Sequence, residues 1–299
     1  MASDDKATTV SASIAELWGI VNVTPDSFSD GGQSERPEQA TGWGLHLARC
    51  GADVVDVGGA SSRPRGDIYG KGAVMLAPEI ETLRVLPVVQ ALCAAGCRVS
   101  IDTIQASVAE AALGAGASIV NDVSCASDAR LLQTVAAHDA GYVLMHRRGD
   151  GATVGKDAIY DDIIESVLAE LDSALARVLA AGIRRERVWL DPGLGFSKDV
   201  ETSRTLLRGL ERLRVFGLPV VVGASRKAFL GMTTPSGAII PAHERDPASY
   251  VAACLAVACG ATAMRVHDVA GTRQALLAAE LLTGTDSTMR RFLRSRDSP

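Results

Sequence analysis

The sequence predicts an α/β fold, a (β/α)8 TIM barrel in a single domain. Short runs rich in β-branched residues alternate along the chain with longer runs of helical period rich in Ala and Leu. A helix between successive strands makes each connection a crossover, and crossovers pair the strands in parallel. Eight such units in 299 residues fit a closed barrel better than an open doubly wound sheet, and no GxGxxG follows a strand-like run.

The strand-like runs follow one another at regular spacing. In chain order they are LWGIVNV (17–23), VVDV (54–57), RVSID (98–102), SIVND (118–122), YVLMH (142–146), RVWLD (187–191), PVVVG (219–223) and AMRVH (263–267). Helices are expected between them, among others at 107–114, 159–181 and 247–258. Three connections are unusually long, at 24–42, 58–77 and 232–246. Long irregular connections in a compact domain usually carry function.

Composition excludes several classes of partner. The formal net charge of −5 argues against nucleic acid or an anionic membrane as the main partner. The first sixteen residues lack the apolar core of a secretory signal, and no apolar run reaches the roughly 18–20 residues of a membrane span. The six cysteines form no CxxC pair, so we expect buried thiols in a reducing cytoplasm rather than a zinc site. The predicted organisation is a flexible segment at 1–16, the barrel at 17–285 and a tail at 286–299.

Polar residues end almost every strand-like run. They are Asn22, Asp56, Asp102, Asn121 with Asp122, His146, Asp191, the segment 225–227, Arg265 and His267. Each has a simple structural explanation when taken alone: Asp102 as a helix cap, Asp191 as the start of a turn, Lys227 as a solvated side chain. Because the carboxyl ends of barrel strands share one mouth, their joint occurrence indicates an active site there.

The residue types also indicate a class of ligand. Buried Asp and Asn side chains suit a flat heterocycle that is rich in N–H groups and ring nitrogens. Arg63, Lys227, Arg265 and His267 add positive charge, which an anionic group requires. The residues therefore predict an enzyme or a binding protein for an amide-rich ring that carries phosphate.

The chain resembles the dihydropteroate synthases, within the wider group of pterin-binding barrels. The resemblance rests on GIVNVTPDSFSDGG, GADVVDVGG, SIDT, GASIVNDV, LMH, LDPGLGF, VGASRKAFLG and RVHDV, which occur in the family's order between about residues 17 and 282. It implies a transferase of folate biosynthesis that joins 6-hydroxymethyl-7,8-dihydropterin diphosphate to 4-aminobenzoate and releases diphosphate. It further implies Mg²⁺ as the cofactor and a cytoplasmic homodimer.

Matching positions imply a role for each site residue. Pterin-binding positions are Asp56, Asp102, Asn121, Met145, Asp191, Gly223 and Lys227. Diphosphate-binding positions are Asn22, Arg63, Arg265 and His267, with Asn22 also approaching the metal. The aminobenzoate loop comprises Ser61, Ser62, Arg63 and Pro64. The resemblance implies catalytic roles for Lys227, Asp102 and Arg63.

The chain departs from the family pattern away from the pterin positions. GGASSRP stands where the family has Gly-Gly-Glu-Ser-Thr-Arg-Pro, so Ala60 replaces the Glu and Ser62 the Thr, and the loop is longer. Other departures are Arg147 for Met, Ser203 near a usual Asn, and Ser197 and Ala248 at usual Gly positions. These changes leave open a paralogue that keeps pterin, diphosphate or sulfa-type ligand binding with little or no turnover. A pterin methyltransferase of the same barrel group is a third interpretation.

Overall fold

The computed structural model describes residues 15–23, 37–60, 76–149, 159–231 and 239–283. Within them a parallel sheet of eight strands follows the order β6-β5-β4-β3-β2-β1-β8-β7. A parallel bridge between Leu190 and Val220 joins β6 to β7 and closes the barrel. The strands are β1 Glu16–Asn22, β2 Val54–Gly58, β3 Val99–Asp102, β4 Ile119–Asp122, β5 Gly141–Met145, β6 Val188–Asp191, β7 Val221–Val222 and β8 Ala263–Val266.

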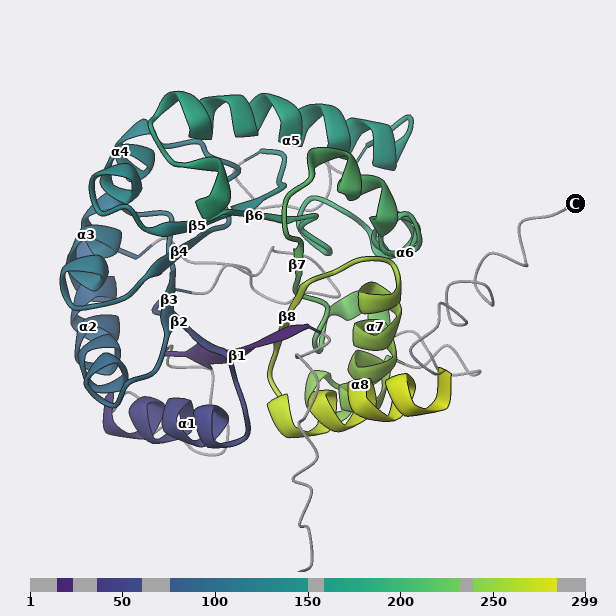
Figure 1. Ribbon diagram of the computed structural model, residues 1–299, viewed down its shortest axis with the longest axis horizontal. Coiled ribbons are helices and arrows are strands. Elements are labelled where there is room, and N and C mark those ends of the chain that lie inside the picture. Colours follow the sequence, from purple (N-terminus) through teal and green to yellow (C-terminus); the bar gives the residue numbers. More distant parts are fainter. Residues whose placement is uncertain (1–14, 24–36, 61–75, 150–158, 232–238, 284–299) are drawn as a thin grey trace, which may run out of the picture.

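Helices form a ring outside the strands (Figure 1). They are α1 Pro37–Arg49, α2 Pro78–Ala94, α3 Ala106–Gly114, α4 Ala129–Ala137, α5 Ile163–Ala180, α6 Val200–Arg208, α7 Asp246–Ala258 and α8 Val269–Thr283. Short 3-10 helices lie at Arg185–Arg187, Leu210–Phe216, Ala228–Leu230 and Ala242–Glu244. In the described part of the chain, no helix combines the length and the apolar character that crossing a membrane requires.

The predicted (β/α)8 TIM barrel is confirmed, with small shifts in the bounds of its elements. Helix α5 begins at Ile163, four residues later than predicted, because the Asp162 side chain caps it by accepting from the N–H groups of Ile164 and Glu165. Strand β7 is shorter than predicted. Val220, just before it, donates its N–H to the Thr262 hydroxyl at 2.9 Å rather than to a strand carbonyl. The segments 1–16 and 286–299 lie outside the described residues, apart from residues 15 and 16.

The barrel interior is apolar at the amino ends of the strands and polar at their carboxyl ends. A buried apolar cluster fills the lower part and comprises Trp18, Val54, Ile119, Val143, Val221 and Ala263, with Trp189 packed edge-on against Trp18. Side chains two positions further along a strand face the same side. The alternation therefore places Asp56 above Val54, Asn121 above Ile119, Asp191 above Trp189 and Arg265 above Ala263. The polar side chains at the carboxyl ends of the strands thus form a layer that packs directly on the apolar cluster.

Candidate active site

Arg265 of β8 reaches across the mouth of the barrel to β2 and β3. Its Nε donates to Asp56 Oδ2 at 2.5 Å, and its Nη2 donates to Asp102 Oδ2 at 2.7 Å. Asn121 Nδ2 donates to the same oxygen of Asp56 at 3.2 Å. The two carboxylates, the amide and the guanidinium therefore form one buried hydrogen-bonded group, with residues from β2, β3, β4 and β8.

Burial sets the protonation of this group. It raises the pKa of Asp102 to about 7, because the attraction of Arg265 does not fully offset the loss of solvent and the repulsion from Asp56. Burial opposes the charge of Arg265 as well, yet the two carboxylates keep its pKa above the ordinary value. Within the described part of the chain, Oδ1 of Asp56 is buried and accepts no hydrogen bond. A buried acceptor of this kind is ready to pair with an N–H group of a ligand.

Lys227 and Asp191 form a second charged group beside the first. Asp191 ends β6 and accepts from the N–H of Gly193 at 2.7 Å, so it does begin a turn. Lys227 is half-buried; its ammonium donates to the carbonyl of Leu194 and lies 4.7 Å from the centre of the Phe196 ring. Burial raises the pKa of Asp191 and lowers that of Lys227 to about 8, while each charge stabilises the other. Lys227 is therefore no solvated surface residue.

His267 lies one residue beyond β8 and is oriented by Ser225. The Ser225 hydroxyl accepts from the backbone N–H of His267 at 3.2 Å and lies 2.9 Å from the ring nitrogen Nδ1. When this hydroxyl donates to Nδ1, the neutral ring carries its hydrogen on Nε2. The arrangement can present an N–H donor to an anion.

Comparison with known proteins identifies the family. Residues 18–267 match the family model described as pterin binding enzyme. The dihydropteroate synthase of Mycobacterium leprae is 42% identical over 265 residues, which cover 87% of this chain and 91% of that protein. The chain belongs to the dihydropteroate synthase family.

Solved structures of dihydropteroate synthases agree with the fold. The enzyme from Xanthomonas albilineans with 4-aminobenzoic acid has a TM-score of 0.82 at 38% identity, covering 91% of this chain and 94% of that one. The same enzyme in complex with 7,8-dihydropteroate has a TM-score of 0.78 at 35% identity, covering 92% of this chain and 97% of that one.

The structure brings most of the sequence-predicted residues of the dihydropteroate synthase site to one mouth. A Cβ atom on Gly223 would lie 3.8 Å from Lys227 Nζ and 3.9 Å from Arg265 Cβ, so this glycine lies beside both residues. Met145 is buried at the end of β5 beside Asp191. Asn22 ends β1 next to Gly58 of β2. Ser61, Ser62, Arg63 and Pro64 lie outside the described residues.

The departures from the dihydropteroate synthase pattern that fall on described residues are accommodated locally. Ser203 is fully buried, and its hydroxyl accepts from the N–H of Gly195 at 3.1 Å. Ser197 has φ of +47°, a conformation that favours glycine, and its hydroxyl donates to the Arg148 carbonyl at 2.6 Å. Ala248 packs partly buried against the core, and Arg147 is half-buried just beyond β5. Ala60 is the last described residue before the 61–75 loop.

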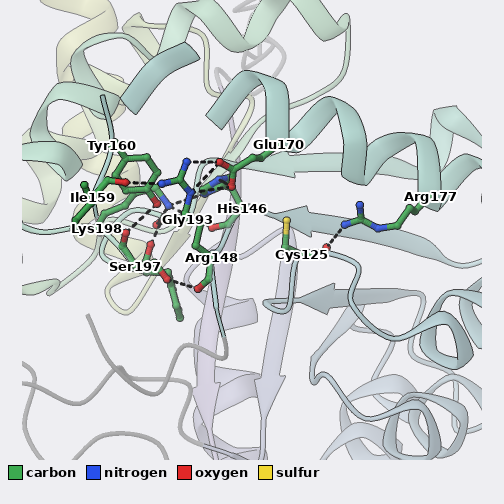
Figure 2. A network of polar contacts seen from close by, with 11 residues as sticks. Cys125, His146, Arg148, Ile159, Tyr160, Glu170, Arg177, Gly193, Ser197 and Lys198 are labelled. Carbon is green, nitrogen blue, oxygen red and sulfur yellow. Dashed lines mark hydrogen bonds and ion pairs between the residues drawn. The ribbon is translucent and has the colours of Figure 1, made fainter. Parts of the chain in front are cut away.

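The sequence reasoning missed one feature of this family member's pocket, the ring of Phe196 against Lys227. Its signal was available, since an aromatic residue beside the Gly193–Gly195 turn is exposed to solvent unless something packs on it. The sequence placed His146 at the mouth but gave no role to Lys198 and Glu170, which contact it (Figure 2).

Proposed function

We propose that this chain catalyses the dihydropteroate synthase reaction, with the pterin bound in the polar layer at the barrel mouth. One observation carries the proposal. Three carboxylates, the buried ones of Asp56 and Asp191 and the largely buried one of Asp102, lie at the barrel mouth with the amide of Asn121 and the cations of Arg265 and Lys227. This combination suits a flat ring with several N–H donors that carries an anionic group.

The carboxylate side of the pocket would hold the pterin ring. Asp102 and Asp191 supply acceptors for ring N–H groups, and Asn121 supplies both a donor and an acceptor. Lys227 lies at the edge of the same pocket, where its ammonium can donate to a ring nitrogen or to the ring carbonyl. Because every one of these groups is at least partly buried, an analogue that leaves one unpaired is rejected.

The cationic side would hold the diphosphate. Arg265 and His267 follow one another along β8 and its end, and both present N–H donors. Among the described residues no group of three or more His, Cys, Asp or Glu side chains forms a metal cage. Mg²⁺ needs no such cage, because in phosphate sites one or two protein oxygens suffice beside phosphate oxygens and water. The carbonyl oxygen of Asn22 fits that requirement, and bound Mg²⁺ would neutralise charge on the leaving diphosphate.

The reaction itself then needs little covalent help from the protein. The amine nitrogen of 4-aminobenzoate forms a bond to the methylene carbon, the bond from that carbon to the diphosphate oxygen breaks, and the amine loses one proton. Arg265 and His267 stabilise the charge on the departing diphosphate, while Lys227 and the carboxylates hold the ring in line with the amine. Ser61, Ser62, Arg63 and Pro64 are proposed to form the aminobenzoate side.

Two known structures support these ligands. The Xanthomonas albilineans enzyme was solved with 4-aminobenzoic acid and with 7,8-dihydropteroate, and both structures cover more than nine-tenths of this chain.

Diphosphate release tests the proposal. Purified protein with 6-hydroxymethyl-7,8-dihydropterin diphosphate, Mg²⁺ and 4-aminobenzoate should release diphosphate only when all three are present. The Asp102→Asn variant should abolish release while the chain stays folded by circular dichroism. Binding of the pterin diphosphate without release of diphosphate would instead identify a binding paralogue. The absence of both binding and release would refute the assigned site.

We further propose a cytoplasmic homodimer. All six cysteines are free thiols, as is usual in a reducing compartment. Helices α7 and α8 lie side by side and expose apolar side chains, namely Val251, Leu277, Leu281 and Leu282. A second copy of the chain would cover them. Light scattering after gel filtration should give twice the 31.2 kDa mass, and Val251→Asp should shift the protein to the monomer.

A further inference from the structure

A buried lysine outside the proposed ligand contacts holds the turn that follows β6. Lys198 has no exposed surface. Its ammonium donates to the carbonyls of Phe196 at 2.9 Å and Gly193 at 3.1 Å, and it lies 3.4 Å from the carbonyl of His146 (Figure 2). One side chain therefore gathers the turn's two carbonyls and attaches the turn to the end of β5.

The same ammonium fixes the state of His146. Lys198 Nζ lies 2.9 Å from His146 Nδ1, and an ammonium can only donate, so Nδ1 is the acceptor. The ring hydrogen is then on Nε2, which lies 3.1 Å from Glu170 Oε2. Burial and the charge of Lys198 lower the pKa of His146 to about 4, so the ring is neutral at pH 7. A directed chain of donors thus runs from Lys198 through His146 to Glu170 on α5.

A second set of contacts clamps the turn from outside. Glu170 accepts from Arg148 at 2.5 and 2.9 Å, and the Arg148 carbonyl accepts from the Ser197 hydroxyl at 2.6 Å. The Tyr160 hydroxyl donates to the Ser197 carbonyl at 2.9 Å, and the Arg148 guanidinium lies over the Tyr160 ring at 4.0 Å. Arg148 and Tyr160 thus link the turn to Glu170 on α5.

The turn that Lys198 holds, residues 192–199, also contacts Lys227. The Leu194 carbonyl accepts from Lys227 Nζ, and the Phe196 ring lies beneath the same ammonium. Both groups lie between the two carbonyls that Lys198 holds. A shift of the turn would therefore move Lys227 relative to Asp191, the carboxylate opposite it.

Keeping a lysine fully buried costs free energy that an apolar residue at the same place would not. Burial lowers the pKa of Lys198 to about 7, which reflects this cost. We propose that Lys198 is a positioning residue, which fixes the Leu194 carbonyl and the Phe196 ring and through them sets Lys227 for the pterin. The proposal rests on the proposed function for the identity of the ligand.

Local hydrogen exchange tests the proposal without substrate. Lys198→Met keeps the aliphatic stem and removes the donor. Amides of the 192–199 turn should then exchange about tenfold faster or more, while the β1 to β4 amides keep their protection. Arg208→Met is the matched control, because it removes an exposed cation from the neighbouring helix α6 and should leave the turn unchanged. Unchanged exchange of the turn in Lys198→Met, or equal acceleration throughout the barrel, would refute the proposal.

A double-mutant cycle measures the link to the pocket. By calorimetry with 6-hydroxymethyl-7,8-dihydropterin diphosphate and Mg²⁺, Lys198→Met should raise Kd about tenfold in the wild-type background. It should raise Kd by a clearly smaller factor, about threefold, in a Phe196→Leu background, because one of the two contacts through which it acts is already lost. Equal effects in both backgrounds would show a merely structural role.

A weaker variant covers the case in which Lys198→Met does not fold. Glu170→Gln leaves Lys198 in place and weakens the hydrogen bonds that the half-buried Glu170 accepts from His146 and Arg148. It should loosen the 192–199 turn and raise Kd severalfold; no change in either would refute the proposal. If the wild-type protein binds no pterin diphosphate, the proposed function fails, and the exchange experiment still decides whether Lys198 holds the turn.

Discussion

Arg265 Nη2 lies 2.7 Å from Asp102 Oδ2, so a cation proposed to bind diphosphate is held by a carboxylate proposed to bind the pterin. The two halves of the substrate therefore meet a single charge network rather than two separate sites. A phosphate that attracts the Arg265 guanidinium changes the charge around Asp102. The pKa of Asp102, about 7, lies close to physiological pH.

Pterin binding should therefore depend on pH. An ionised Asp102 accepts hydrogen bonds from ring N–H groups and a protonated one loses half of that capacity, so affinity should rise with pH through about 7. Calorimetry with 6-hydroxymethylpterin, which carries no phosphate to titrate, between about pH 5.5 and 8.5 measures this dependence. Asp102→Asn should bind about a hundredfold more weakly and without that pH dependence. A flat profile for the wild-type protein would rule out Asp102 as the acceptor.

Ser225→Ala should impair the step that involves the diphosphate. Without the hydroxyl, both the ring nitrogen Nδ1 and the backbone N–H of His267 lose their partner, so the ring is no longer held in place. We expect kcat/KM for the pterin diphosphate to fall about tenfold, while binding of 6-hydroxymethylpterin, which lacks the diphosphate, is unchanged. The control is Ser173→Ala on the exposed face of α5, which should behave as wild type. Equal losses for both ligands would contradict the assigned role.

His146 should lower the free energy of unfolding on mild acidification, whereas the raised pKa of Asp102 acts in the opposite direction over the same pH range. The contribution of His146 is therefore measured as the difference between the wild-type protein and a His146 variant. The folded-state pKa of His146, about 4, lies below the ordinary value of 6.5, so between these values the unfolded chain binds a proton that the folded chain does not. Stability from this group is complete above pH 6.5 and decreases as pH falls towards 4, by an amount on the order of 3 kcal/mol. Urea unfolding at several pH values measures it.

The variants for that experiment are His146→Gln and, at an exposed position, His243→Gln. The difference in the free energy of unfolding between the wild-type protein and His146→Gln should shrink as pH falls from 6.5 to 4, whereas the difference between the wild-type protein and His243→Gln should not change with pH. The same pH profile in all three proteins would show that His146 is not the responsible group.

Gly193 should tolerate no side chain. A Cβ atom there would lie 2.0 Å from the His146 carbonyl oxygen, at φ of +67°. Gly96 has a similar φ of +79° with nothing within 4 Å of its Cβ position, so Gly96→Ala reports backbone strain alone. We expect a loss of about 1 kcal/mol for Gly96→Ala and of more than about 4 kcal/mol for Gly193→Ala. Comparable losses in urea unfolding would mean that the turn moves away freely.

The sequence was enough to locate the mouth and most of the pocket. Polar residues at successive strand ends must converge in a parallel barrel, so Asp102, Asn121 and Asp191 follow from the alternation of strands and helices. The bonding within the layer did not follow. Asp102 could equally have capped the next helix, but in the structure the Thr103 hydroxyl accepts from Gln105, and Asp102 pairs with Arg265.

Lys198 shows why other parts were out of reach. In the sequence it precedes Asp199 at the start of a helix, where a lysine is ordinarily solvated. It is buried because the Gly193 turn folds back onto the end of β5, and that contact depends on residues about fifty positions away. Neither composition nor periodicity encodes such a long-range approach.

The site lies at the junction where the barrel closes. Strands β6 and β7 are joined by the single bridge between Leu190 and Val220, and Asp191 and Lys227 stand on opposite sides of that joint. A ligand that pairs with both side chains would link β6 to β7, which are joined by the fewest hydrogen bonds of any neighbouring strands in the barrel. Substrate binding and the integrity of the barrel are then coupled, and the protein is most firmly closed when it is occupied.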